Sequence, residues 1–342
     1  MKLIFYIKGI YMFKTLAFNL RKIAILSSVA LLFSVFSVQA DENDPDRNQL
    51  RLQVIQLFIT EQWAQLDSVA DGLKQGLPTT KDKTFKISVF YNAIDETYFR
   101  DQMTPSLFDY YEKSVDKWIK NNPKSSSAYL IQASIMNARA SNLRGQGYAD
   151  KVDPAIWPEY NKILEKEKEF LIKHKDVSGT DPRWYEEMQV VAKLLSDEKL
   201  GNQTFEEGYA AFPSYTGIYL QAMDAQLPKW GGTPEGVEKV ARIAAKNQTG
   251  LSTYAYIWYN ALLSQPDLIP LLAQNKVVSW VDMRKGFEDE LEENPNKTTY
   301  EHYLSSICAA GDKALYNEKR GRLKSGANPS HWLPEYGTHE CD

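Results

Sequence analysis

The segment TPSLFDYYEKSVDKW, residues 104–118, decides the fold class that the sequence predicts. Thr104 is a preferred N-cap residue, and Pro105 suits the first position of an α-helix, where the backbone N–H is not needed. Apolar side chains then recur at helical spacing, at Leu107, Tyr111, Val115 and Trp118. A helix with one apolar stripe is stable only when a neighbour covers that stripe. We therefore expect this helix to pack against others.

The same pattern recurs along the chain. Asp181 with Pro182 and Thr233 with Pro234 predict two further helix starts. Near the amino end, two apolar stripes separated by a break at Thr60 predict an antiparallel helix pair. Residues 85–91 alternate like a strand, but the apolar pattern continues to residue 98 with helical spacing, so we expect a helix there. No segment carries a convincing strand or hairpin pattern.

Many short amphipathic helices joined by short links favour one architecture. Each helix pair keeps an apolar face exposed until the next pair stacks on it. The sequence therefore predicts an all-α fold, with antiparallel helix pairs stacked as a tetratricopeptide-like α-solenoid. The complete tetratricopeptide signature never occurs, so no repeat count follows.

The first forty residues have the pattern of a secretory signal peptide. They carry five basic and no acidic residues, and residues 23–36 form an apolar or small stretch. That stretch is shorter than the roughly twenty residues of a membrane-spanning helix, and Val38 and Ala40 supply a small-x-small cleavage pattern. We expect cleavage after Ala40 and a periplasmic or secreted protein. An uncleaved anchor is the alternative, and either Met1 or Met12 could be the start.

The charge balance indicates which partners to expect. The chain has 40 basic and 44 acidic residues, and loss of the leader leaves a net charge of −9. Such an acidic protein is a poor ligand for nucleic acid or anionic lipid. No second long apolar run follows the leader, so we expect no membrane span after cleavage. We divide the chain into a signal peptide (1–40), a helical domain (41–265), a carboxy-terminal helical extension (266–325) and a tail (326–342).

Cys308 and Cys341 are the only cysteines. In an exported chain they predict a disulfide that ties the tail to the last helices, and two free thiols are the alternative. His331 and His339 lie near Cys341, but their spacing matches no standard zinc pattern, so we expect no metal site.

Several short strings occur in a characteristic order. They are QWAQLD (62–67), WIKNNP (118–123) followed by Ser125 and Ala128, LRG (143–145), DPRWY (181–185), FPSY (212–215) and LPKWGG (227–232) followed by TPE (233–235). In this order the chain resembles the bacterial domain of unknown function family 4034, over roughly residues 50–262. The resemblance implies a tetratricopeptide-like helical build and brings no reaction and no catalytic residue. The sequence departs from the pattern after residue 262, and residues from 267 onward look like an added module.

Two of these strings contain candidate binding residues. Lys229, Trp230, Gly231 and Gly232 form a loop that either grips a peptide or sugar or makes a helix-to-helix corner with Trp230 in the core, and we favour the corner. Arg144, followed by Gly145, either holds a substrate carboxylate or pairs with a helix acid, and pairing is favoured. The remaining candidates are Trp184, Tyr185 and Tyr215.

No catalytic motif occurs in the sequence, and we expect no catalytic residue and no cofactor. The leading hypothesis is a non-enzymatic module that binds a protein or peptide in the periplasm. One alternative is an immunity or inhibitor protein against a delivered toxin. Another is a cell-wall or glycan hydrolase that uses a carboxylate pair drawn from Glu186, Glu187, Glu206 and Glu207.

Overall fold

The computed structural model describes residues 44–81, 83–99, 103–145, 147, 149–247, 250–322 and 332–334. Contacts divide the chain into two compact units, residues 1–48 and 49–342. In the first unit the described residues begin a helix, where Asp44 Oδ1 accepts a 3.0 Å hydrogen bond from the backbone N–H of Arg47. The predicted signal peptide and its cleavage point after Ala40 lie outside the described residues.

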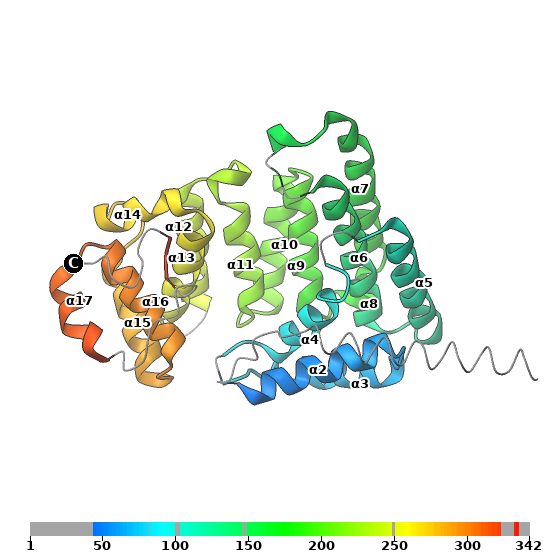
Figure 1. The fold of residues 1–342 in the computed structure, drawn as a ribbon, viewed down its shortest axis with the longest axis horizontal. Coiled ribbons are helices and arrows are strands. Elements are labelled where there is room, and N and C mark those ends of the chain that lie inside the picture. Colours follow the sequence, from blue (N-terminus) through cyan, green and yellow to red (C-terminus); the bar gives the residue numbers. More distant parts are fainter. Residues whose placement is uncertain are drawn as a thin grey trace, which may run out of the picture. The chain divides into compact units, whose positions relative to one another are not determined.

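Every regular element among the described residues is a helix. The α-helices are α2 (Pro45–Ile59), α3 (Trp63–Lys74), α4 (Lys86–Asp95), α5 (Pro105–Asn121), α6 (Ser126–Arg144), α7 (Trp157–Lys173), α8 (Lys175–Ser178), α9 (Pro182–Leu194), α10 (Glu198–Ala211), α11 (Thr216–Ala225), α12 (Pro234–Asn247), α13 (Ser252–Ser264), α14 (Ile269–Gln274), α15 (Trp280–Glu293), α16 (Lys297–Ala309) and α17 (Lys313–Lys319). Short 3₁₀ turns are η1 (Ala149–Lys151), η2 (Pro154–Ile156), η3 (Pro228–Trp230), η4 (Pro266–Leu268) and η5 (Arg320–Arg322). In the described ranges, extended pairing is confined to an isolated bridge between Thr79 and Phe85. The all-α class is confirmed (Figure 1).

The three predicted Pro-led starts are real helix starts. Helices α5, α9 and α12 begin at Pro105, Pro182 and Pro234. Asp181 caps α9 by accepting a 3.0 Å hydrogen bond from the N–H of Arg183, and Thr233 accepts a 3.1 Å bond from Gly236. Thr104 makes no such bond, and its hydroxyl lies 3.0 Å from Ser106 Oγ instead. Pro105 alone therefore marks the start of α5.

The ambiguous run at residues 85–91 belongs to helix α4 (Lys86–Asp95). Ile87, Phe90, Tyr91 and Ile94 are fully buried. Because α4 is covered on more than one side, its apolar residues are too frequent to leave a clear polar face, which explains the strand-like alternation.

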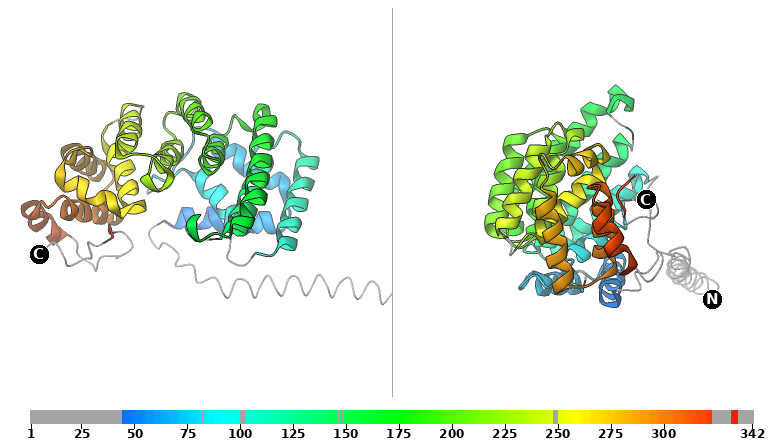
Figure 2. Two further views of the ribbon diagram at one scale, coloured as in Figure 1. Left: turned by 90° about the horizontal axis from the view of Figure 1, so that it is seen from above. Right: turned by 90° about the vertical axis from the view of Figure 1, so that its left-hand side faces the viewer.

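Within residues 49–342, helices pack against their neighbours in sequence. Helix α5 packs on α6, α6 on α7, α9 on α10, and α12 on α13. Helices two positions apart also touch, since α11 contacts both α9 and α13. The green-to-yellow helices accordingly lie side by side in sequence order in Figures 1 and 2.

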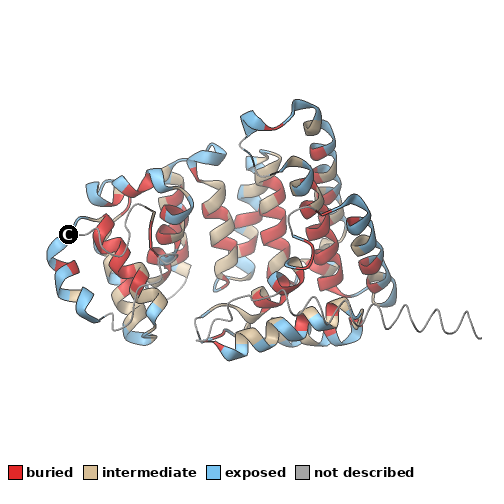
Figure 3. Cartoon of the chain, viewed as in Figure 1, coloured by how far each residue is buried: buried red, intermediate tan, exposed pale blue. Residues whose placement is uncertain are grey.

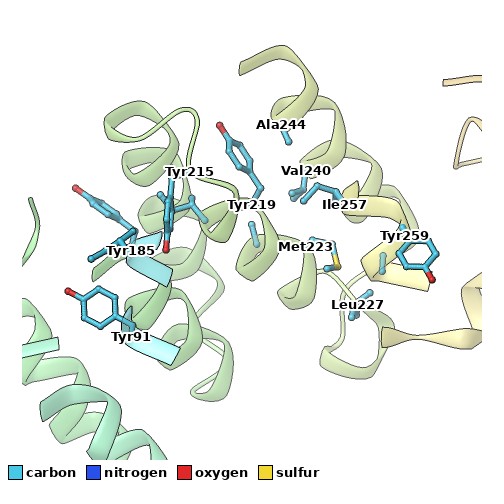
Figure 4. Packing of buried hydrophobic residues seen from close by; sticks show 14 of the residues in the cluster. Tyr91, Tyr185, Tyr215, Tyr219, Met223, Leu227, Val240, Ala244, Ile257 and Tyr259 are labelled. Atoms are coloured by element: carbon cyan, nitrogen blue, oxygen red, sulfur yellow. The ribbon is translucent and has the colours of Figure 1, made fainter. Parts of the chain in front are cut away.

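One hydrophobic core extends through this second unit, and buried residues line the facing sides of its helices (Figure 3). In Figure 4, Tyr219 and Met223 of α11 lie between Tyr91 of α4 and Ile257 of α13. All four side chains belong to the same buried cluster. Most of the aromatic side chains pack in this core, as the helical spacing predicts. Trp118 and Trp258 are among the fully buried ones.

The core continues past the domain boundary predicted at residue 265, which falls inside the second unit and stays a prediction. Part of the predicted tail also packs here, because Trp332 and Leu333 are buried and the N–H of Leu333 donates a 2.7 Å hydrogen bond to Ser305 Oγ of α16. Cys308 of α16 is buried. Cys341 lies outside the described residues, so the disulfide stays a prediction. None of the helices described is both long and apolar enough to cross a bilayer.

Candidate functional site

A polar pocket of about 230 Å³ lies among helices α4, α6, α9 and α11. Its lining residues are Asn92, Asp95, Phe99, Ser134, Asn137, Arg183, Glu186, Glu187, Val190 and Gln221. Asn92 and Phe99 are exposed and form its rim, whereas Asn137, Glu186 and Glu187 are buried. The pocket therefore leads from the surface to buried polar groups.

Local sequence places the three charged residues of α9. Asp181 caps the helix and Pro182 begins it, so Arg183 lies in the first turn. Glu186 and Glu187 follow at i+3 and i+4, the spacings that bring helical side chains together. One helical turn thus presents a guanidinium and two carboxylates to the same pocket.

Arg183 is shared by three carboxylates. Its Nε lies 2.7 Å from Glu187 Oε1, its Nη1 lies 3.3 Å from Glu186 Oε2, and its Nη2 lies 2.6 Å from Asp95 Oδ2. The guanidinium also lies over the ring of Tyr91, 5.5 Å from its centroid. With 15% of its side chain exposed, Arg183 is largely buried, and its one positive charge faces three acids.

Asp95 is fully engaged, and Glu186 lies against α11. Asp95 Oδ1 accepts hydrogen bonds from Tyr98 Oη at 2.5 Å and Ser134 Oγ at 2.9 Å, while Oδ2 faces Arg183. Glu186 Oε2 accepts a 3.3 Å hydrogen bond from Arg183, and interaction with the Tyr215 hydroxyl opposes the rise that burial causes in the pKa of Glu186. A Cβ at Gly217 would lie only 1.6 Å from Glu186 Oε1, so a larger residue at 217 would displace this carboxylate from its present position.

Glu187 differs from Asp95. Its Oε1 accepts from Arg183, but no hydrogen bond within the described part of the chain reaches Oε2. Its side chain is 5% exposed and lines the pocket, so this oxygen is available to a ligand there. Burial raises the pKa of Glu187 from 4.5 to about 7; Arg183 opposes the rise, and the charges of Asp95 and Glu186 add to it.

A second buried acid lies behind the pocket. Glu167 of α7 is 0% exposed, and its Oε2 accepts a 3.3 Å hydrogen bond from Nδ2 of Asn137. Its Oε1 has no partner among the described residues. Burial, with repulsion from Glu187, raises the pKa of Glu167 well above its ordinary value. Burial therefore favours the protonated, uncharged form of Glu167.

The four acids proposed for hydrolysis do not form one site. Glu186 and Glu187 line the pocket, but Glu206 and Glu207 of α10 are not among its lining residues. Glu206 is exposed, and Glu207 forms an ion pair with Lys175 at 2.5 Å. No group of three or more acidic, histidine or cysteine residues in the described ranges has the arrangement of a metal site.

Arg144 and Gly145 form a helix end. The guanidinium of Arg144 lies over the ring of Trp157, 5.8 Å from its centroid, and its Nη1 donates a 3.1 Å hydrogen bond to the Gly145 carbonyl. Gly145 ends α6 with φ of 74°, a conformation that favours glycine. Arg144 thus contacts an aromatic ring, whereas pairing with a helix acid was expected, and it does not line the pocket.

The three aromatic candidates are buried. Trp184 donates a hydrogen bond of 3.0 Å to the Leu171 carbonyl, and Tyr185 packs edge-on against Trp184 with centroids 5.0 Å apart. Tyr215 is fully buried, and its hydroxyl lies 2.8 Å from Ser88 Oγ. Only Tyr215 touches the pocket's network, through Glu186.

The Lys229–Gly232 loop is a corner, but Trp230 does not fill the core there. Trp230 is 42% exposed and lies beneath Lys193, whose Nζ is 4.8 Å from the ring centroid. Gly231 has φ of 88°, and a Cβ at Gly232 would lie 2.3 Å from the backbone of Gln226. The glycine part of the expected corner is confirmed, and the expectation of a buried indole is wrong, because the ring packs against Lys193 and stays partly exposed. Lys229 pairs with Asp224 at 3.4 Å.

The candidate residues are therefore dispersed, and the pocket uses others. Sequence reasoning missed Arg183, Asp95 and Asn137 as pocket residues, and it weighed Glu186 and Glu187 only as part of a larger acid set. A local signal existed for α9, since an arginine followed by acids at i+3 and i+4 behind a capped start predicts a charged cluster. Nothing local signals Asp95 or Asn137, which come from other helices.

Comparison with protein-family models finds no match for this sequence, and comparison with curated proteins finds none either. The resemblance to family 4034 stays a prediction that rests on the quoted strings.

Proposed function

We propose that this chain is an exported, non-enzymatic binding protein that receives a protein or peptide partner in the periplasm or outside the cell. We propose further that its helices form antiparallel pairs stacked as a tetratricopeptide-like solenoid, the build that the family resemblance implies. The contacts of α11 with α9, α10, α12 and α13 support this arrangement, because repeat arrays are built from nearest-neighbour contacts.

The observation that carries the binding proposal is the pocket around Arg183. Its charged groups are fixed by contacts from three helices, and one acceptor, Glu187 Oε2, has no partner among the described residues. Binding sites commonly combine a preformed concavity with a few fixed polar groups that orient the ligand. This pocket has both properties.

Hydrolysis is the runner-up, and the pKa of Glu187 at about 7 is the observation in its favour, since a general acid needs a proton near neutral pH. A glycosidase also needs a second carboxylate free to act on the substrate or on water. Glu186 and Asp95 both already bond to Arg183, and Asp95 also accepts from two hydroxyl groups. We therefore favour binding. Purified protein that clears peptidoglycan or glycan gels, and loses this activity in Glu187→Gln, would reverse the preference.

An immunity or inhibitor protein would be a special case of the same binding. The net charge of −9 expected after leader removal suits a basic partner. Deletion of the gene should then sensitise cells to toxin-producing kin, and unchanged survival in competition would count against this version.

Site-specific photocrosslinking tests the binding proposal. A photoreactive phenylalanine analogue at Phe99, on the pocket rim and 45% exposed, should crosslink a defined partner in the cell envelope. The same analogue at Ile172 is the matched control, because Ile172 is 54% exposed and does not line the pocket. Equal labelling from both positions, or none from Phe99, would contradict the proposal.

A further inference from the structure

We propose that the pocket binds a positively charged nitrogen group, a primary ammonium or a guanidinium, held against Glu187 Oε2. This inference rests on the proposed binding function and names the chemistry of the ligand. The group could belong to a lysine or arginine side chain of a peptide, or to a free small amine.

The charges around the pocket favour a cation over an anion. Three carboxylates, those of Asp95, Glu186 and Glu187, surround one guanidinium. An anion that approached Arg183 would face all three acids at close range and would be repelled. A cation beside Glu187 would balance the acid that shares Arg183 with two others.

The buried acceptor gives the cation a defined position. Glu187 is more than nine-tenths buried, its Oε1 is occupied, and its Oε2 has no partner within the described residues. A charge-assisted hydrogen bond to such an oxygen is stronger than a neutral one. This oxygen in the pocket wall is therefore the acceptor to which we expect the ligand's N–H group to donate.

The size of the pocket selects a small group. At about 230 Å³ it falls below the roughly 300–1,000 Å³ typical of pockets that enclose drug-sized ligands. It can take the end of one long side chain. Phe99 at the rim and Val190 in the wall offer apolar contact to the methylene stem of that side chain.

Binding should depend on pH, because burial raises the pKa of Glu187 to about 7. The groups that face it are Arg183 and Glu186 on α9, Asp95 on α4, Tyr98 in the turn after α4, and Glu167 on α7. A cation binds only the ionised form of Glu187 well, so affinity should rise from about pH 6 to about pH 8 and binding should release a proton.

Calorimetric titration of the purified protein with Nα-acetyl-lysine methylamide tests the inference. We expect binding that the uncharged norleucine analogue does not show. Glu187→Gln should weaken it by about tenfold or more, the effect of losing a hydrogen bond to a charged group. Glu206→Gln, the same chemical change at an exposed acid outside the pocket, should leave it unchanged.

A second variant guards against misfolding of Glu187→Gln. Asn92→Lys changes an exposed rim residue and places a cation of the chain's own beside the pocket, so it should abolish binding without loss of stability. Circular dichroism of each variant checks the fold. Cadaverine and a lysine-containing tripeptide amide then separate the two sources: equal affinity indicates a free amine, and clearly tighter peptide binding indicates a side chain.

Three results would overturn the inference: no binding of any of these amines at millimolar concentration, equal binding of the norleucine analogue, or a correctly folded Glu187→Gln that binds as the unmodified protein does. If one of these results were obtained but Phe99 still crosslinked to a partner, only the cationic ligand would be rejected and the binding function would be retained.

Discussion

Replacement of Arg183 by Met tests the centre of the pocket most directly. The change keeps much of the side-chain volume but removes the one guanidinium that faces Asp95, Glu186 and Glu187. Removing one partner of a buried ion pair typically destabilises a protein by about 3–5 kcal/mol, because the remaining charge is buried without compensation. Burial of these side chains places Arg183 in that class.

The free-energy cost of protonating a buried carboxyl gives a second estimate of this destabilisation. Without Arg183 a carboxyl such as Glu186 must stay protonated to remain buried. Its ordinary pKa is 4.5, and each pH unit above that value corresponds to about 1.4 kcal/mol. At pH 7 the protonation therefore adds at most about 3.4 kcal/mol, because burial already raises the pKa of Glu186 while Arg183 is present, and at about pH 5 it adds less than about 1 kcal/mol. In the variant the folded-state pKa lies above the unfolded value, so the destabilisation is small near pH 4.5 and grows as the pH rises.

Urea unfolding followed by tryptophan fluorescence at the two pH values measures this loss. Arg139→Met is the matched control, since Arg139 also bonds two acids, Asp109 and Glu112, but at the surface. Exposed pairs of this kind contribute about 0–1 kcal/mol. A loss in Arg183→Met no larger than that of the control, or a loss that is greater at pH 5 than at pH 7, would refute the reasoning.

Three further outcomes follow from particular residues. Glu167→Gln should gain stability relative to the unmodified protein as the pH rises above 4.5, the ordinary pKa of Glu167. The pKa of Glu167 is raised in the folded state, so the unmodified protein loses stability over this range; identical melting temperatures of the two proteins at every pH would contradict this. Gly232→Ala should destabilise the protein by about 1–3 kcal/mol, since the new Cβ would lie 2.3 Å from the Gln226 backbone. Gly72→Ala in α3, where a Cβ meets open space, should instead stabilise it by about 0.5–1 kcal/mol. Thermal melts that rank the two variants in the opposite order would reject the packing described. Trp258→Ala should lower the free energy of unfolding by about 3–5 kcal/mol, because the Trp258 ring is fully buried. Trp230→Ala should lower it by about 1 kcal/mol or less, because the Trp230 ring is 42% exposed. Comparable losses of stability in urea unfolding would indicate that Trp230 belongs to the core.

The helix starts could be predicted because their signals are local. Pro182 fixes the first turn of α9 and Asp181 supplies the cap, and both are read from adjacent residues. The helix class at residues 85–91 needed only the longer apolar period. Such features depend on backbone chemistry within one turn, which the sequence displays directly.

The pocket could be predicted only in part, because it joins residues far apart in the chain. Arg183 and Glu187 lie in one turn, but Asp95 is 88 residues away from Arg183. No local pattern shows that α4 brings its last residue to the first turn of α9. The predicted burial of Trp230 was wrong for a related reason. A loop that contains Pro, Trp and Gly can form a corner whether the indole ring points into the core or toward solvent.

Helix α6 has a consequence for how the chain can be shortened. Fourteen of its 19 residues are buried, and α4, α5, α7, α8 and α9 all contact it. A simple repeat array can lose terminal repeats and keep the remainder soluble, since each repeat covers only the next. Here, deletion of everything before α6 would remove two of its covering helices and expose apolar and polar side chains that are buried in the whole chain. The amino-terminal half should therefore fold and unfold cooperatively. Truncated variants that are meant to fold should retain all of it.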